Sequence, residues 1–160
     1  NVMPISIGQN TVQKLNKNLL LVYTGLKRTA HHIAKSYVNK LQTSKKSHIL
    51  EISNFVTEGE KIIQRGTIDD FGKLLHESWL EKKSLSSAIT NSSIDYIYNK
   101  ALKKGALGGK LLGAGGGGFL IFYVPHYKQK NFIKCFRNLI TVPFKFTSEG
   151  SKIMFKKFNK

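Results

Sequence analysis

A dense cluster of glycines constrains the fold of this chain more than any other feature of its sequence. Eight of the 14 glycines lie between Gly105 and Gly118. Strand-like segments flank the densest part at 107–112 and 119–124, so the sequence predicts a β-hairpin around a glycine loop. Glycine permits positive φ and lets backbone N–H groups come close to an anion or to another segment. We predict a functional loop, with a flexible hairpin tip as the alternative.

Two phosphate-binding motifs resemble this loop but do not match it. Gly113-x-Gly115-x-x-Gly118 has the spacing of the dinucleotide fingerprint, yet a strand follows it where that fingerprint requires a helix. A Walker A loop needs four residues between its glycines and a Ser or Thr after the lysine. Here three residues separate Gly105 from Gly109, and Leu111 follows Lys110. Both motifs are excluded.

The spacing of apolar residues predicts an α+β domain. The helices are grouped in a block rather than alternating with strands, which favours an antiparallel sheet covered by helices. Gly66 and Gly105 are expected to end helices, and Thr67 with Asp70 and Ser92 with Asp95 have the form of capping boxes. The expected order is ββααααββαβ(β). The strands are expected at 2–7, 19–24, 107–112, 119–124, 142–147 and 153–155. The helices are expected at 30–41, at 49–63, from 67 onward, at 92–102 and at 125–139.

Length and composition indicate a single domain over residues 1–160 with a real core. The 160 residues are 41% hydrophobic, and the longest apolar runs are far below the roughly 18 residues that a membrane span needs. We therefore expect no membrane partner. The single thiol, Cys135, excludes an internal disulfide framework and fits a buried, inert cysteine in a cytoplasmic protein. The chain begins within strand-like Val2–Ile7 and without a signal peptide, so we expect an N-terminal portion to be missing.

The net charge of +17 raises the question of nucleic-acid binding. Only three of the 26 basic residues are arginine, the side chain best suited to bidentate contacts with bases and phosphates. The lysines are spread along every segment, and no known nucleic-acid-binding signature accompanies them. We expect no specific nucleic-acid partner, although a basic binding module stays open as an alternative.

The glycine loop resembles a known family motif. Gly105-Ala-x-Gly-Gly-Lys-Leu-Leu-Gly-Ala-Gly-Gly-Gly-Gly118 is similar to the third conserved motif of the GHMP kinases, which include galactokinase, homoserine kinase and mevalonate kinase. Three further segments are similar to those of D-glycero-D-manno-heptose 7-phosphate kinases: Tyr23-Thr-Gly-x-x-Arg28, Leu75-His-Glu-x-Trp79 with Lys82 and Lys83, and Asp95-x-Ile-Tyr98. The resemblance covers about residues 2–155.

This resemblance implies a fold and an activity. It implies the ferredoxin-like C-terminal domain of a sugar kinase that uses ATP and Mg to phosphorylate the anomeric hydroxyl of a heptose 7-phosphate, giving the 1,7-bisphosphate. In GHMP kinases the main ATP phosphate loop, the magnesium-binding acid and the catalytic aspartate lie in the N-terminal domain, and no such stretch occurs here. The implied partners are a phosphosugar and the N-terminal kinase domain, and the fragment is expected to be inactive alone. Another sugar of the same superfamily is an alternative substrate.

The resemblance also assigns roles to residues. The run Gly113, Ala114, Gly115, Gly116, Gly117 and Gly118 is expected to support the nucleotide phosphates or to pack beside the N-terminal phosphate loop. Arg28 is the first candidate for binding the substrate phosphate, with the Thr24 hydroxyl in support, because a guanidinium contacts phosphate in a bidentate way. A solvated arginine is the alternative. Lys110 could reach an anion, or could face water.

The helix that begins near Thr67 offers further candidates. His76 and Trp79 share one helical face and could line a sugar pocket, although Trp79 fits the core better. Lys83 is a weaker phosphate candidate. Asp95 has a capping position, so we do not assign it a catalytic role. The pair His31-His32 lacks cysteines or carboxylates at metal-ligand spacing, and no metal ligand is predicted. We assign no catalytic residue to this chain.

Overall fold

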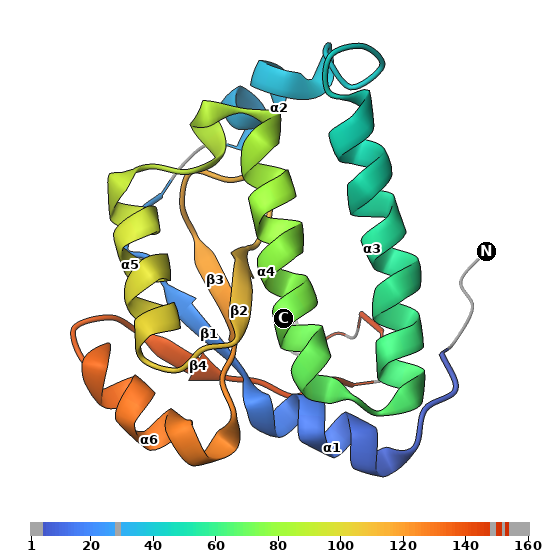
Figure 1. Cartoon of the computed structure of the whole chain (residues 1–160). Helices are drawn as coiled ribbons and strands as arrows, with labels where there is room; N and C mark the ends of the chain where they lie inside the picture. The colour runs from blue at the N-terminus through green and yellow to red at the C-terminus, as the bar shows by residue number, and fades with distance from the viewer. Residues whose placement is uncertain (1–4, 28–29, 148–149, 152, 154–160) are drawn as a thin grey trace, which may run out of the picture.

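The computed structural model of the chain describes residues 5–27, 30–147, 150–151 and 153. Figure 1 shows a twisted sheet at the centre, with α4 and α5 beside it and α3 packed outside α4. The elements are α1 (Gln9–Asn18), β1 (Leu19–Tyr23), α2 (Ala30–Val38), α3 (Lys46–Arg65), α4 (Ile68–Leu85), the 3-10 helix η1 (Ser87–Ile89), α5 (Ser92–Lys103), β2 (Gly108–Leu111), β3 (Phe119–Tyr123), α6 (His126–Cys135) and β4 (Thr141–Pro143).

The four strands form one antiparallel sheet in the order β2-β3-β1-β4. The hairpin strands pair with Lys110 opposite Ile121, and β1 pairs with β3 so that Tyr23 lies opposite Phe119. The glycine loop therefore connects an edge strand to an inner strand. This arrangement confirms the predicted α+β class with an antiparallel sheet and helices.

One face of the sheet carries the main hydrophobic core. Leu20, Val22 and Phe122 point to this face and are buried, because strand residues two apart share a side. Helices α4, α5 and α6, with the residue that follows α6, cover it with side chains that include Trp79, Ile94, Ile97, Tyr98, Ala101, Phe132 and Phe136. Trp79 is 0% exposed, so its prediction as a core residue is confirmed.

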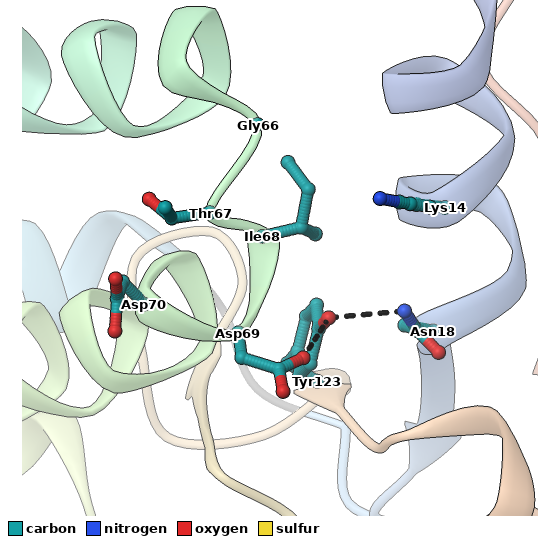
Figure 2. A pocket seen from close by; sticks show the side chains of 8 residues that line it. All are labelled: Lys14, Asn18, Gly66, Thr67, Ile68, Asp69, Asp70 and Tyr123. Carbon is teal, nitrogen blue, oxygen red and sulfur yellow. Dashed lines mark hydrogen bonds between the residues drawn. The ribbon is translucent and has the colours of Figure 1, made fainter.

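The other face is closed at one end by contacts around Tyr123. Its hydroxyl donates to Asp69 Oδ1 at 2.6 Å and accepts from Asn18 Nδ2 at 3.0 Å, and Figure 2 shows these groups at one side of a pocket of about 420 Å³ between α1 and α4. Burial raises the pKa of the Tyr123 phenol, and the neighbouring carboxylate adds to this. The phenol therefore keeps its proton and links α1 to α4.

Helix α4 lies directly on the edge strand β2. A Cβ atom built on Gly108 would lie 2.0 Å from the carbonyl oxygen of Gly72 and 2.9 Å from Cβ of His76. Only glycine permits this close approach of helix and strand backbones. Helix α3 then packs on α4, and Nδ1 of His48 on α3 lies 2.7 Å from Oε2 of Glu81 on α4. The glycine at 108 thus sets the distance between sheet and helices.

Several sequence predictions need correction. The described part of the expected first strand, residues 5–7, is not a strand, and the unpredicted helix α1 follows it. The last strand is shorter than expected, because residues 144–147 are not in β4, and Ile153 is not in a strand. Residues 2–4 and 154–155 of the two expected terminal strands lie outside the described residues.

The predicted caps and stops are partly right. Gly66 ends α3 with φ of 77°, as expected. The Thr67 side chain does not cap α4, and α5 is capped by Asn91, whose Oδ1 accepts from the N–H of Ile94, instead of by Ser92. Within the helix that apolar spacing predicts at 49–63, Val56 is 72% exposed.

We predict that Gly108→Ala destabilises the chain by about 3 kcal/mol, because the new methyl group forces α4 away from β2. Urea unfolding measures this as a lower midpoint. Gly8→Ala is the matched control, since no atom lies within 4 Å of its built Cβ. Equal midpoints for the two variants would contradict the close contact.

Candidate functional site

The glycine loop is fixed to two other parts of the chain. The N–H of Gly116 donates to the carbonyl oxygen of Ile89 at 2.8 Å, and the N–H of Gly118 donates to that of Leu26 at 3.0 Å. Both the N–H and the hydroxyl of Thr24 donate to the carbonyl oxygen of Gly118 at 2.9 Å. The loop is therefore held between the end of β1 and η1 rather than hanging free.

Two positions in the loop require glycine for steric reasons. Gly115 has φ of 122°, and its built Cβ would lie 2.8 Å from Cα of Ile89. The Cβ of residue 117 would lie 2.6 Å from the carbonyl oxygen of Leu26. Either side chain would move the loop away from its supports.

Part of the loop backbone has free donors. Within the described chain, no acceptor takes the N–H groups of Gly113, Ala114, Gly115 or Gly117. Successive free N–H groups in a turn are the arrangement that proteins use to bind anions. Gly113 is exposed and Ala114 and Gly117 are half-buried, so the loop can donate to phosphate oxygens at these positions, whereas Gly115 is buried.

Lys82 of α4 supports the loop from the other side, and the sequence prediction did not assign it to the site. Its Nζ donates to the carbonyl oxygens of Leu111 at 2.8 Å and Gly113 at 2.6 Å. Burial lowers the pKa of Lys82 to about 8, and the charge of Lys110 contributes. The signal in the sequence was the resemblance, since Lys82 accompanies the segment Leu75–Trp79 that is similar to heptose 7-phosphate kinases.

Lys110 points toward α4 instead of toward water. Its Nζ donates to the hydroxyl of Ser78 at 2.9 Å, beside a pocket of about 150 Å³ between α3, α4 and β2. Burial lowers the pKa of Lys110. The prediction that this side chain could face water is therefore wrong.

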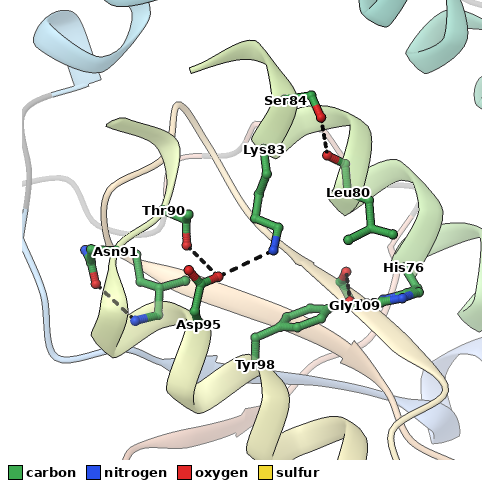
Figure 3. Close-up of polar contacts among 10 residues, drawn as sticks. His76, Leu80, Lys83, Ser84, Thr90, Asn91, Asp95, Tyr98 and Gly109 are labelled. Atoms are coloured by element: carbon green, nitrogen blue, oxygen red, sulfur yellow. Dashed lines mark hydrogen bonds and ion pairs between the residues drawn. The ribbon is translucent and has the colours of Figure 1, made fainter. Parts of the chain in front are cut away.

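His76 belongs to a hydrogen-bonded chain between α4, α5 and β2 (Figure 3). Its Nδ1 lies 2.8 Å from the Tyr98 hydroxyl, which donates to the carbonyl oxygen of Gly109 at 3.1 Å. Because the single phenol proton goes to that carbonyl, Nδ1 of His76 is the donor to Tyr98. In the neutral ring, Nε2 of His76 is then an acceptor without a hydrogen-bond partner among the described residues.

Lys83 and Asp95 are used in structural contacts. Lys83 Nζ lies 3.5 Å from Asp95 Oδ1 and 5.6 Å from the centre of the Trp79 ring. Asp95 Oδ1 also accepts from the hydroxyl of Thr90 at 3.0 Å, as Figure 3 shows. These contacts hold α4, η1 and α5 together near the loop.

The structure brings only some of the predicted residues together. Thr24 is 6% exposed and contacts the loop directly. Lys110 belongs to β2, and His76 lies beside this strand on α4. Arg28 lies outside the described residues. In the described part of the chain, no group of three or more His, Cys, Asp or Glu could hold a metal ion, and no helix is long and apolar enough to cross a membrane.

Comparison with known proteins identifies the family. Residues 60–139, which include α4, β2 and the glycine loop, match the family described as GHMP kinases C terminal. The chain belongs to the GHMP kinases. The matched GHMP region contains the glycine run, which is also the segment that carries the resemblance in the sequence.

Individual GHMP relatives agree with this. The chain is 30% identical over 154 residues to a D-glycero-alpha-D-manno-heptose 7-phosphate kinase of Campylobacter jejuni, covering 94% of this chain and 45% of the relative. It is 35% identical over 104 residues to an L-fucokinase/L-fucose-1-P guanylyltransferase of Bacteroides fragilis, covering 63% of this chain and 11% of that protein. The chain thus spans less than half the length of these relatives.

The fold of the GHMP domain also matches a solved structure. A D-glycero-D-manno-heptose 1-phosphate kinase of Bacteroides thetaiotaomicron superposes with a TM-score of 0.65 at 21% identity, covering 97% of this chain and 42% of that one. At this identity the match supports the fold alone.

We predict that the ε resonances of Lys82 in this GHMP domain titrate near pH 8, against 10.5 for an ordinary lysine. NMR titration measures this, and Lys110→Met should raise the midpoint by removing a neighbouring positive charge. Since the pKa is lower in the folded state, Lys82 makes the free energy of unfolding rise between about pH 8 and 10.5. A midpoint above 10 would contradict the desolvated position.

Proposed function

We propose that this chain is the C-terminal half of an ATP-dependent sugar kinase, with residues 1–160 forming one domain. The proposed reaction transfers a phosphoryl group to the anomeric hydroxyl of D-glycero-D-manno-heptose 7-phosphate and gives the 1,7-bisphosphate. The observation that carries the proposal is the 30% identity to a heptose 7-phosphate kinase along 94% of this chain. The anchored glycine loop supports it, because that loop has free donors for phosphate oxygens.

The residues of this chain fit a supporting role toward ATP and Mg. ATP would supply the phosphoryl group, and Mg would neutralise charge on its phosphates. The free N–H groups of Gly113, Ala114 and Gly117 suit phosphate oxygens, because these residues are at least partly exposed. The resemblance to GHMP kinases assigns the main ATP phosphate loop and the magnesium-binding acid to the N-terminal domain, so we assign both ATP and Mg mainly to that half.

We propose that the phosphosugar is bound by Thr24, Arg28, His76, Lys83 and Lys110. Phosphoryl transfer depends on positioning and on neutralising charge, which hydroxyl, imidazole and cationic groups supply. His76 would offer Nε2 as an acceptor to a sugar hydroxyl, because Tyr98 holds its other ring nitrogen. We infer no specific nucleic-acid partner. ATP as co-substrate and an unpaired Cys135 favour the cytoplasm.

Another sugar is the second candidate substrate. The chain is 35% identical over 104 residues to an L-fucokinase/L-fucose-1-P guanylyltransferase, so the domain fits kinases named for different sugars. A direct comparison of heptose 7-phosphate and L-fucose as substrates decides between them.

We predict that the chain joined to its N-terminal half phosphorylates heptose 7-phosphate in an ATP-dependent assay, with the 1,7-bisphosphate identified by phosphorus NMR. The 160-residue chain alone should give no product, because the main ATP loop is expected in the other half. Full activity of the isolated chain would overturn the assignment as a half-enzyme. Salt-resistant binding to unrelated oligonucleotides, with no kinase activity, would favour a nucleic-acid-binding module instead.

A second prediction concerns Gly115. Gly115→Ala should lower kcat of the joined enzyme by about 100-fold, because a displacement of the loop by an ångström misaligns the reacting groups. Gly150→Ala is the control, since nothing lies within 4 Å of its built Cβ. An unchanged kcat in Gly115→Ala would exclude a role of the loop in phosphate positioning.

A further inference from the structure

Two lysines beside the glycine loop have positive charges that no carboxylate of the described residues neutralises. Lys82 and Lys110 are both partly buried, and neither forms an ion pair with a carboxylate of the described residues. Seven of the nine acidic residues lie on α3 and α4, which flank this position. Acids are thus present on both helices but do not pair with these two cations.

The geometry places the two ammonium groups along the same edge of the sheet. Ser78 and Lys82 are four residues apart on α4 and share a face. Lys110 Nζ reaches Ser78 Oγ at 2.9 Å, and Lys82 Nζ reaches the carbonyl oxygen of Leu111, the next residue of β2, at 2.8 Å. The two ammonium groups are close enough for the charge of Lys110 to contribute to the lowered pKa of Lys82. The pocket of about 150 Å³ beside Ser78 and Lys110 is otherwise lined by apolar residues and does not include Lys82.

The ammonium groups of Lys82 and Lys110 have N–H donors available for a ligand. An ammonium group has three N–H donors. Lys82 uses two of them on the carbonyl oxygens of Leu111 and Gly113, and Lys110 uses one on Ser78. Three N–H donors on two partly desolvated cations therefore stay free within the described structure. Burial lowers the pKa of both lysines, which a bound anion would reverse.

We propose that Lys82, Lys110 and Ser78 form a binding subsite for a phosphate monoester. A phosphate group offers several acceptor oxygens and up to two negative charges, which match the free donors and the unpaired cations. The subsite rests on the proposed kinase function. It extends that function by adding Lys82 to the phosphate ligands and by giving Ser78 the role of orienting Lys110. The phosphate is that of the phosphosugar or that of the nucleotide, and kinetics separate these sources.

The test uses the full-length enzyme with Lys110→Met and Lys82→Gln. Each should raise the KM for the phosphosugar roughly tenfold or more with the KM for ATP unchanged, because a charge-assisted contact is lost. Lys110→Arg should retain most of the affinity, as guanidinium also binds phosphate. Lys130→Met and Lys134→Met are the controls, because they remove two exposed lysines of α6. Thermal unfolding confirms that each variant is folded.

The possible results separate support for the subsite from its rejection. A raised KM for ATP alone supports the subsite and assigns it to the nucleotide phosphates. Unchanged KM values for both substrates in active, folded variants overturn the subsite and leave the proposed function intact. If the wild type phosphorylates no sugar, the proposed function fails, and titration with inorganic phosphate decides the subsite. Shifts of the ε resonances of Lys82 and Lys110 that are absent for Lys130 support it, and no shift overturns it.

Discussion

The close contact of α4 with the edge strand β2 is the constraint on which the rest of this structure depends. With no Cβ on Gly108, the backbone of α4 at Gly72 lies against the strand. That distance puts Ser78 within reach of Lys110, and Lys82 within reach of the carbonyl oxygens of Leu111 and Gly113. A wider separation would break these contacts, because hydrogen bonds weaken over a few tenths of an ångström.

The glycine loop is rigid for reasons that lie outside the loop. Several of its glycines adopt positive φ, and a segment so rich in residues without a Cβ would by itself be flexible. Hydrogen bonds to the carbonyl oxygens of Ile89 in η1 and of Leu26 after β1 hold the loop in place. Thr24 also donates to the carbonyl oxygen of Gly118. Small residues therefore serve close packing here, and the N–H groups left over are held in a fixed direction. Such preorganisation is what binding of phosphate oxygens requires.

Much of the fold could be predicted from apolar spacing, and the failures have physical causes. Strand β1 and helix α5 are strongly patterned, so their burial follows from sequence. Helix α1 was missed because it is mostly polar and buries only Leu15. Asn91 and Ser92 are adjacent residues that can both cap a helix, and only the backbone decides between them. Lys82 and Lys83 differ only in the helical face they occupy, so tertiary contacts determine which one reaches the loop.

The net charge of +17 is a poor guide to the function of this chain, whereas local charge balance is a better one. An exposed lysine is solvated and screened by salt, so most of the 26 cations add little to any specific contact. Lys82 and Lys110 differ because burial has removed part of their water and no carboxylate replaces it among the described residues. A cation in that state costs folding free energy until an anion binds. In the proposed subsite, selection of a phosphate ligand would therefore depend on two partly buried charges rather than on the whole basic surface.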